Sequence, residues 1–168
     1  MAHTRTPSLV PRTVHSIPSV ELRQSLPSQV ASISPFVDQL MQFIRKLRGG
    51  DGSEIDIEIA LREALANAVI HGNGENSCSR VYVACRCYMD GEVSITVRDQ
   101  GQGFDSNTVP DPTAPENRLL THGRGIYRMN TLMDEISFEE RGSVVRMRKK
   151  STLVQGHRGD QNDKLSRK

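Results

Sequence analysis

The chain has 168 residues, of which 36% are hydrophobic and 25% charged, and its formal net charge is +2. This length suits one domain with a single core. The weak net charge and the few aromatic residues (three Tyr, four Phe, no Trp) argue against a nucleic-acid-binding platform. No apolar run reaches the ~18 residues of a membrane span. Neither nucleic acid nor a membrane is therefore expected as a direct partner.

The ends of the chain differ in composition from its middle. Residues 1–18 are rich in Pro, Ser, Thr and Arg without an apolar period, and residues 151–168 are similarly polar. We predict a disordered N-terminal arm and a disordered C-terminal tail, neither with an assigned role. Residues 19–150 are predicted to form the domain.

Three cysteines, Cys78, Cys85 and Cys87, lack metal-ligand spacing. Their odd number, without a signal-peptide pattern at the N-terminus, predicts reduced thiols and a cytoplasmic location. Cys85 and Cys87 are two apart in a predicted strand and so share one face. They are interpreted as small core residues.

A strand and a helix are the first predicted elements. Val20–Leu26 mixes apolar and polar residues and stops before a proline, as an edge strand does. Ser34 is the predicted N-cap of a helix with Pro35 at its first position. Apolar residues then repeat at helical spacing. Gly49 and Gly50 are predicted to end this helix.

A second helix is predicted from after Ser53 to about His71, largely buried because its apolar residues lie on more than one side. A first hairpin is predicted from the strands Arg80–Tyr88 and Glu92–Asp99. A polar segment (100–122) and a short helix (Gly125–Met133) follow. The strands Glu135–Glu140 and Ser143–Lys149 then form a second hairpin. This order predicts an α+β fold, a two-layer sandwich with helices on one face of a mixed, mainly antiparallel sheet.

The second predicted helix carries Glu63, Asn67 and His71 at intervals of four residues, which places them on one helical face. Ordinary interpretations exist, with Glu63 as a solvated charge and His71 as a helix cap. However, this helix is apolar enough to be buried, and a buried Glu is rare without a partner. A carboxylate beside an amide oxygen is a reasonable place for a metal-bound polyphosphate.

Asp99 ends an apolar strand and is followed by Gly101 and Gly103. Glycines at alternate positions let the backbone turn sharply and approach a ligand closely. An ordinary Asp-Gly loop is the alternative.

Gly123, Arg124 and Gly125 open the short predicted helix. Backbone N–H groups at a helix N-terminus favour phosphate oxygens, and Arg124 could add a bidentate contact. A glycine-rich linker is the alternative, because the surroundings of a dinucleotide-binding fingerprint are missing.

Taken together, the three motifs resemble the N, G1 and G2 boxes of the GHKL superfamily, which includes gyrase, MutL and sensor histidine kinases. LREALANAVIHGN and RGIYRMNTLMDEISF are similar to the anti-sigma factor serine-protein kinases of that superfamily, and Ile70 stands where sensor kinases carry a basic residue. The resemblance spans about residues 20–150 and implies the Bergerat ATP-binding fold.

The resemblance implies that ATP and Mg²⁺ are bound. By position, Asp99 would accept a hydrogen bond from the adenine amino group, and Gly101 and Gly103 would admit the nucleotide. Asn67 would ligate Mg²⁺, and Glu63 would be the general base.

Three further parts of the site follow from the same resemblance. Gly123, Arg124 and Gly125 would cradle the phosphates, with the side-chain role of Arg124 inferred from its charge. His71 is counted with the nucleotide-binding residues, and residues 105–121 would form a lid.

In function, the resemblance implies an ATP-dependent serine/threonine-protein kinase. Such kinases phosphorylate an STAS-domain anti-anti-sigma protein, sequester a sigma factor and typically form homodimers. Two alternatives stay open. One is a nucleotide-gated protein-binding regulator without phosphotransfer, and the other is a detached histidine-kinase-like ATPase domain.

Overall fold

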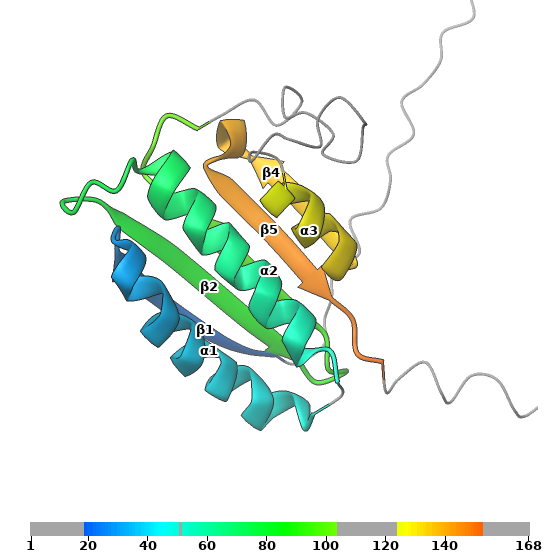
Figure 1. Ribbon diagram of the computed structural model, residues 1–168. Coiled ribbons are helices and arrows are strands. Elements are labelled where there is room, and N and C mark those ends of the chain that lie inside the picture. Colours follow the sequence, from blue (N-terminus) through cyan, green and yellow to red (C-terminus); the bar gives the residue numbers. More distant parts are fainter. Residues whose placement is uncertain (1–18, 51, 104–123, 153–168) are drawn as a thin grey trace, which may run out of the picture.

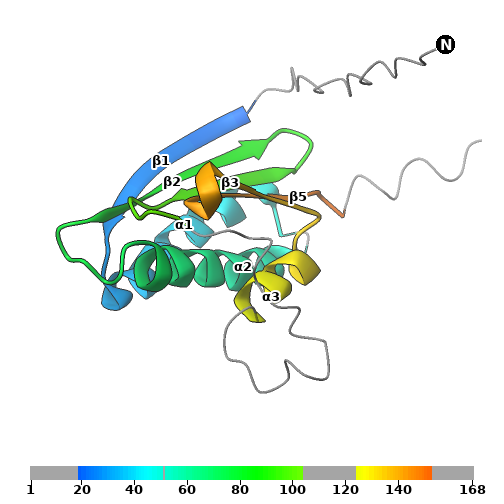
Figure 2. The ribbon, with the colours of Figure 1, turned by 90° about the horizontal axis from the view of Figure 1, so that it is seen from above.

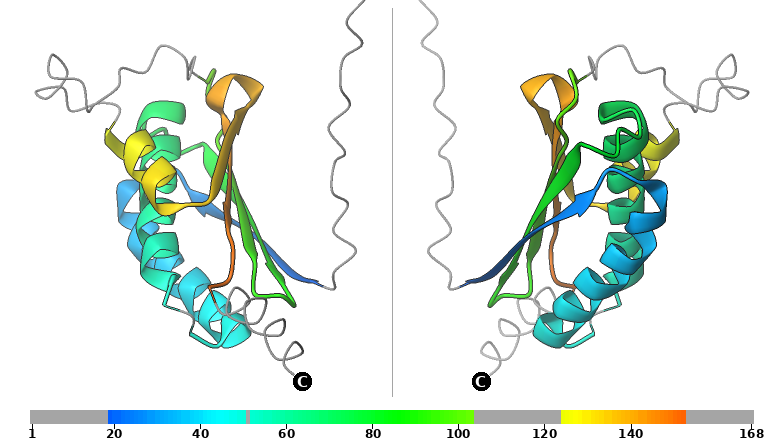
Figure 3. Two further views of the ribbon diagram at one scale, coloured as in Figure 1. Left: turned by 90° about the vertical axis from the view of Figure 1, so that its right-hand side faces the viewer. Right: turned by 90° about the vertical axis from the view of Figure 1, so that its left-hand side faces the viewer.

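The computed structural model describes residues 19–50, 52–103 and 124–152. These residues form two layers, with all three α-helices on one face of a single sheet (Figure 3). Within these ranges no helix combines the length and apolar character that crossing a bilayer requires. The predicted α+β sandwich is confirmed.

Five strands make up the sheet, in the order β1-β2-β3-β5-β4. Their bounds are Ser19–Pro27 (β1), Arg80–Tyr88 (β2), Val93–Arg98 (β3), Glu135–Glu139 (β4) and Val144–Lys149 (β5). The predicted strand at 20–26 is indeed at an edge. All four strand pairings in the described sheet are antiparallel. The predicted, mainly antiparallel character is therefore confirmed, but the sheet is not mixed.

The first helix, α1, spans Ile33–Arg48 and begins one residue before the predicted N-cap at Ser34. Its N-cap is Ser32, which makes no side-chain capping bond, and a 3₁₀ turn (η1, Val30–Ser32) leads into it. The prediction was wrong here because the preceding turn already supplies helical geometry, so no side-chain cap is required. The helix ends as predicted at Gly49, which has a φ of +71°.

The central helix, α2, spans Glu54–Ala66 and lies between α1 and α3 (Arg124–Leu132), as Figures 1 and 2 show. A six-residue π-helical turn, η2 (Asn67–Gly72), continues α2 to the predicted end of the helix. Both neighbours pack against α2, so it occupies the middle of the helical layer and carries residues into the core and the site.

The core lies between the helical layer and the alternate residues of the strands that face it. In β2 and β3 these are valines, an isoleucine and two cysteines: Val81, Val83, Cys85, Cys87, Val93, Ile95 and Val97. Cys85 and Cys87 are free thiols buried on one face, as predicted. Every second strand residue points to the opposite, polar face of the sheet.

The first residue after the predicted end of the domain packs against the first hairpin. Ser151 is buried beside Gly91, the hairpin glycine, which has a φ of +82°. The predicted arm (1–18), most of the predicted tail and the predicted lid (105–121) lie outside the described residues.

Candidate functional site

The N-box residue Asn67 and the G1-box residues Asp99 and Gly103 lie together where β3 ends, beside the C-terminal end of α2. One pocket is lined by residues of α2, η2, β3 and the β4–β5 hairpin: Ala64, Asn67, Ala68, Gly72, Val97, Asp99, Gly103, Phe138, Gly142 and Val145. Asn67, Asp99 and Gly103, three of the predicted site residues, therefore share one pocket although they are up to 36 positions apart in the chain.

The π turn decides which residue follows Asn67 on the pocket side. In η2 the N–H of Asn73 donates to the carbonyl of Ala68, five residues earlier, at 2.8 Å. This wider turn moves Gly72 to the pocket side, where an α-helix would have placed His71. His71 is exposed and does not line the pocket. The predicted line of three residues therefore continues from Glu63 and Asn67 to Gly72.

Close packing of glycines shapes the pocket around Asp99. A Cβ on Gly72 would stand 2.4 Å from the Asp99 Cγ, and one on Gly101 would stand 1.9 Å from the Gly72 carbonyl oxygen. Gly103 has a φ of +74°, and a Cβ there would lie 2.2 Å from the carbonyl oxygen of Arg141. No other residue fits these positions without movement, so the glycines let three backbone segments converge.

Asp99 is a half-buried carboxylate held by backbone groups. Its Oδ1 accepts a hydrogen bond from the Gly101 N–H at 2.8 Å, and its own N–H donates to the Ser143 carbonyl at 3.0 Å. Burial raises the pKa of Asp99 above its ordinary value, and hydrogen bonds from backbone N–H groups oppose part of this rise. The carboxylate is thus oriented inside the pocket and poorly hydrated.

Asn73 ties the loop after η2 to the loop after β3. Its Oδ1 accepts from the Gln100 N–H at 2.8 Å, and its Nδ2 donates to the Arg80 carbonyl at 3.2 Å. In return, the Gln100 Oε1 accepts from the Arg80 N–H at 2.7 Å. These bonds fix the start of the G1 loop relative to the N-box helix.

The first turn of α3 reaches the other side of the N box. A Cβ on Gly125 would stand 2.7 Å from the Glu63 Oε2 and 3.6 Å from the Asn67 Nδ2. The Arg128 guanidinium donates through Nη1 to the Glu63 Oε1 and forms an ion pair with it. Glu63 is therefore partnered, as expected for a carboxylate in an apolar helix, and its side chain is 23% exposed.

Not every predicted residue is placed. Gly123 lies outside the described residues. Arg124 is exposed at the first position of α3, and Gly125 follows it in the same turn. The G2 box is thus brought to Glu63 and Asn67 through Gly125.

Two features of the pocket suit an adenine base. Asp99 offers an acceptor in the pocket lining, and the glycines let the surrounding backbone segments pack closely around that carboxylate. No group of three His, Cys, Asp or Glu side chains suited to a metal ion occurs in the described part of the chain. Asn67 is a pocket residue that could ligate Mg²⁺ together with the phosphates, since this ion is commonly bound by few protein ligands and by substrate phosphates.

Sequence reasoning missed three kinds of residue here. Gly72 follows the predicted end of the helix and belongs to the LREALANAVIHGN motif, but the sequence does not assign it to the pocket. Asn73 had no signal beyond its position in a turn. Arg128 could not be found, because its partner Glu63 is 65 residues away in the sequence.

Comparison with known proteins agrees with this geometry. The profile of the histidine kinase-like ATPase domain matches residues 26–149. The anti-sigma F factor of Heyndrickxia coagulans is 35% identical over 128 residues, which are 72% of this chain and 81% of the relative. That of Bacillus subtilis (strain 168) is 31% identical over 134 residues, 76% and 80% of the two chains.

A second name occurs among the relatives. The serine-protein kinase RsbW of Oceanobacillus iheyensis is 27% identical over 101 residues, 56% of this chain and 63% of the relative. The N, G1 and G2 boxes all lie within the matched range of the family profile. The chain therefore belongs to the histidine kinase-like ATPase (GHKL) family and, within it, to the group of anti-sigma factors and serine-protein kinases.

Proposed function

We propose that this protein is an ATP-dependent serine/threonine-protein kinase of the anti-sigma factor type. One observation carries the proposal: Asn67 and Asp99 line the same glycine-walled pocket, and Glu63 lies one helical turn before Asn67. An adenine acceptor and a metal ligand then line the pocket, and a base stands one helical turn before the metal ligand on α2.

Adenine recognition is assigned to Asp99. Its carboxylate would accept from the exocyclic amino group of adenine, and guanine has a carbonyl at that place, which cannot donate. Gly101 and Gly103 would let the base enter between the sheet and the loop, because a side chain at either position would push apart the backbone segments that form the pocket.

Phosphate and metal binding are assigned to the N and G2 boxes. Asn67 would ligate Mg²⁺, which neutralises phosphate charge in phosphoryl transfer. Gly123, Arg124 and Gly125 would hold the phosphates at the start of α3, whereas the exposed His71 lies outside the pocket lining and is assigned no contact with the nucleotide. The position of Gly125 against Glu63 and Asn67 supports this arrangement.

Glu63 is assigned the role of general base. It would take the proton of the acceptor hydroxyl as that oxygen bonds to the γ-phosphorus and the bond to the β-phosphate oxygen breaks, releasing ADP. The reaction depends mainly on positioning and charge neutralisation, and a positioned base contributes typically 10²–10⁴-fold.

The partners in this proposal are two proteins. The acceptor is a serine or threonine of an STAS-domain anti-anti-sigma protein, and the second partner is a sigma factor that the kinase sequesters as a homodimer. The names of the relatives support the sigma-factor partner. A cytoplasmic location agrees with the free thiols of Cys78, Cys85 and Cys87.

Phosphotransfer is tested with labelled ATP, Mg²⁺ and candidate STAS proteins. The variant Glu63→Gln should lower the transfer rate by about 100-fold or more and leave the dissociation constant of ATP within about threefold. Glu58→Gln is the matched control, since Glu58 lies on the same helix and pairs with Arg45 and Arg62, away from the pocket.

The same assay separates the kinase from a binding regulator. The relatives named anti-sigma F factor favour the regulator as second candidate, since that name describes action on a sigma factor and not phosphotransfer. If ATP binds and label moves to no STAS protein, the regulator replaces the kinase. If calorimetry detects no binding of ATP with Mg²⁺, both assignments fail.

A further inference from the structure

We propose that Arg128 is the positioning residue for Glu63: by holding one carboxylate oxygen, it keeps the other turned toward the nucleotide site. This inference rests on the role of Glu63 in the proposed function, and it concerns a residue that none of the three boxes contains.

The two oxygens of the Glu63 carboxylate have different neighbours. Oε1 accepts from the Arg128 Nη1. Oε2 faces the backbone of Gly125, at the place where a Cβ would stand 2.7 Å away, and the Asn67 amide atoms lie 3.6 and 3.7 Å from that same point. One oxygen is thus bound, while the other points to the residues assigned to magnesium and phosphate.

Helical geometry explains why the pair forms. Gly125 lets α3 approach α2 closely, and Arg128 follows it by three positions, so both lie on the face of α3 that meets α2. Arg128 thus reaches Glu63 from the partner helix. The arginine next to Glu63 in the sequence, Arg62, turns away from it to Glu58 and Asp38.

The pair holds a side chain that would otherwise be mobile. A Glu side chain on a helix has several accessible rotamers, and only some of them direct an oxygen at an acceptor hydroxyl. Glu63 is the less exposed partner, 23% against 55% for Arg128, so the arginine reaches in from the surface. Fixing one oxygen keeps the other close to the reactive geometry, which is where positioning contributes to rate.

Kinetics test the consequence. Arg128→Ala should lower kcat for phosphotransfer about tenfold with KM for ATP and the melting temperature unchanged, and Arg128→Lys should recover part of the rate. Arg146→Ala is the matched control, because Arg146 also forms an exposed ion pair, with Glu139 on β4, far from Glu63.

Carboxyl labelling tests the contact itself without nucleotide or partner. In the free protein, carbodiimide modification of Glu63, measured by peptide mass spectrometry, should rise severalfold in Arg128→Ala and stay constant in Arg146→Ala. Labelling of Glu58 serves as the internal reference.

Three results would overturn the inference: equal Glu63 labelling in the native protein and Arg128→Ala, an unchanged or higher kcat in that variant, or a loss confined to ATP affinity. If the native protein binds ATP but phosphorylates nothing, the proposed function fails separately. The labelling result, together with the rate of ATP hydrolysis by water, then decides the role of Arg128.

Discussion

The two ends of strand β3 each carry a carboxylate, and they stabilise it in different ways. Glu92 precedes the strand and is paired with the Arg148 guanidinium, which donates to both of its oxygens at 2.7 and 3.0 Å. Asp99 follows the strand and accepts from the backbone of a glycine-rich loop. One charge is neutralised within the protein, whereas the other remains available to a ligand.

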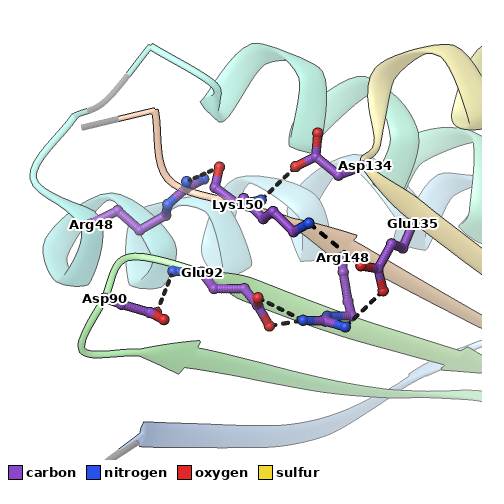
Figure 4. A network of polar contacts seen from close by, with 7 residues as sticks. All are labelled: Arg48, Asp90, Glu92, Asp134, Glu135, Arg148 and Lys150. Carbon is purple, nitrogen blue, oxygen red and sulfur yellow. Dashed lines mark hydrogen bonds and ion pairs between the residues drawn. The ribbon is translucent and has the colours of Figure 1, made fainter. Parts of the chain in front are cut away.

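The Glu92 end is a network of charged contacts, drawn in Figure 4. Arg148 also pairs with Glu135 at 2.7 Å, which links β5 to β4. The Lys150 N–H donates to Asp134, and its carbonyl accepts from Arg48 of α1. The end of β5 is therefore anchored to both layers.

At the Asp99 end, neighbouring segments are packed closely together without ion pairs. Gly72 and Gly101 bring the backbone against the carboxylate. Ion pairs thus hold the fold together at the Glu92 end, whereas the pocket at the Asp99 end depends on glycines, which have no side chain. Changes at the Glu92 end should affect stability, and changes at the Asp99 end should affect affinity.

The largest effect is expected for Arg148→Ala. This variant removes the guanidinium that donates to both oxygens of the Glu92 side chain, which is 8% exposed, and should lower the free energy of unfolding by about 3–5 kcal/mol. Urea denaturation measures the loss, and ATP titration at 10 °C should show little change in affinity. Arg146→Ala on the same strand should cost less than about 1 kcal/mol. A comparable loss in both variants would contradict a special role for the network.

A smaller effect, on affinity, is expected for Gly72→Ala. The new Cβ would fall 2.4 Å from the Asp99 Cγ, so the carboxylate must move, and overpacking of this kind costs about 1–3 kcal/mol. ATP affinity, measured by calorimetry, should fall by up to about 100-fold. Gly50→Ala strains a backbone with a φ of +76° in open space. That variant should lose stability and keep its affinity for ATP. Equal ATP affinities for the two variants would contradict the idea that the glycines around Asp99 govern binding.

The smallest effect is expected for Asp99→Asn, which keeps an oxygen in the pocket lining and removes the charge. ATP affinity should fall about 10-fold, since a hydrogen bond to a charged group contributes about 1.5–3 kcal/mol. Stability at pH 7 should be equal or higher, because burial raises the pKa of Asp99 and makes its ionised form unfavourable in the folded state.

The raised pKa of Asp99 also predicts how the stability difference between the native protein and Asp99→Asn changes with pH. Between its ordinary and its raised pKa, Asp99 binds more protons in the folded state than in the unfolded state. Its stabilising contribution is therefore complete below the ordinary pKa and is lost as pH rises through the raised one. The native protein should lose stability relative to Asp99→Asn over that window in urea titrations from pH 4 to 7. A difference of opposite sign would show that the carboxylate is stabilised by its surroundings.

Much of the fold could be predicted because it depends on local preferences. Glycines after apolar repeats ended α1, and Gly91 supplied the left-handed residue of the first hairpin. The N, G1 and G2 boxes are also local signals, since each is a spacing of residues along one helix or directly after one strand. The misplaced start of α1 at Ser34 shows the limit of this approach, because a preceding 3₁₀ turn replaced the expected cap.

The sequence alone determined the order of elements, the family and the residues around Asn67 and Asp99. Only the tertiary structure placed Gly72 on the pocket side in the position expected for His71, and joined Arg128 to Glu63. The physical reason is range: turn and strand preferences act over a few residues. The ion pair, in contrast, joins residues 65 positions apart and exists because α3 packs against α2.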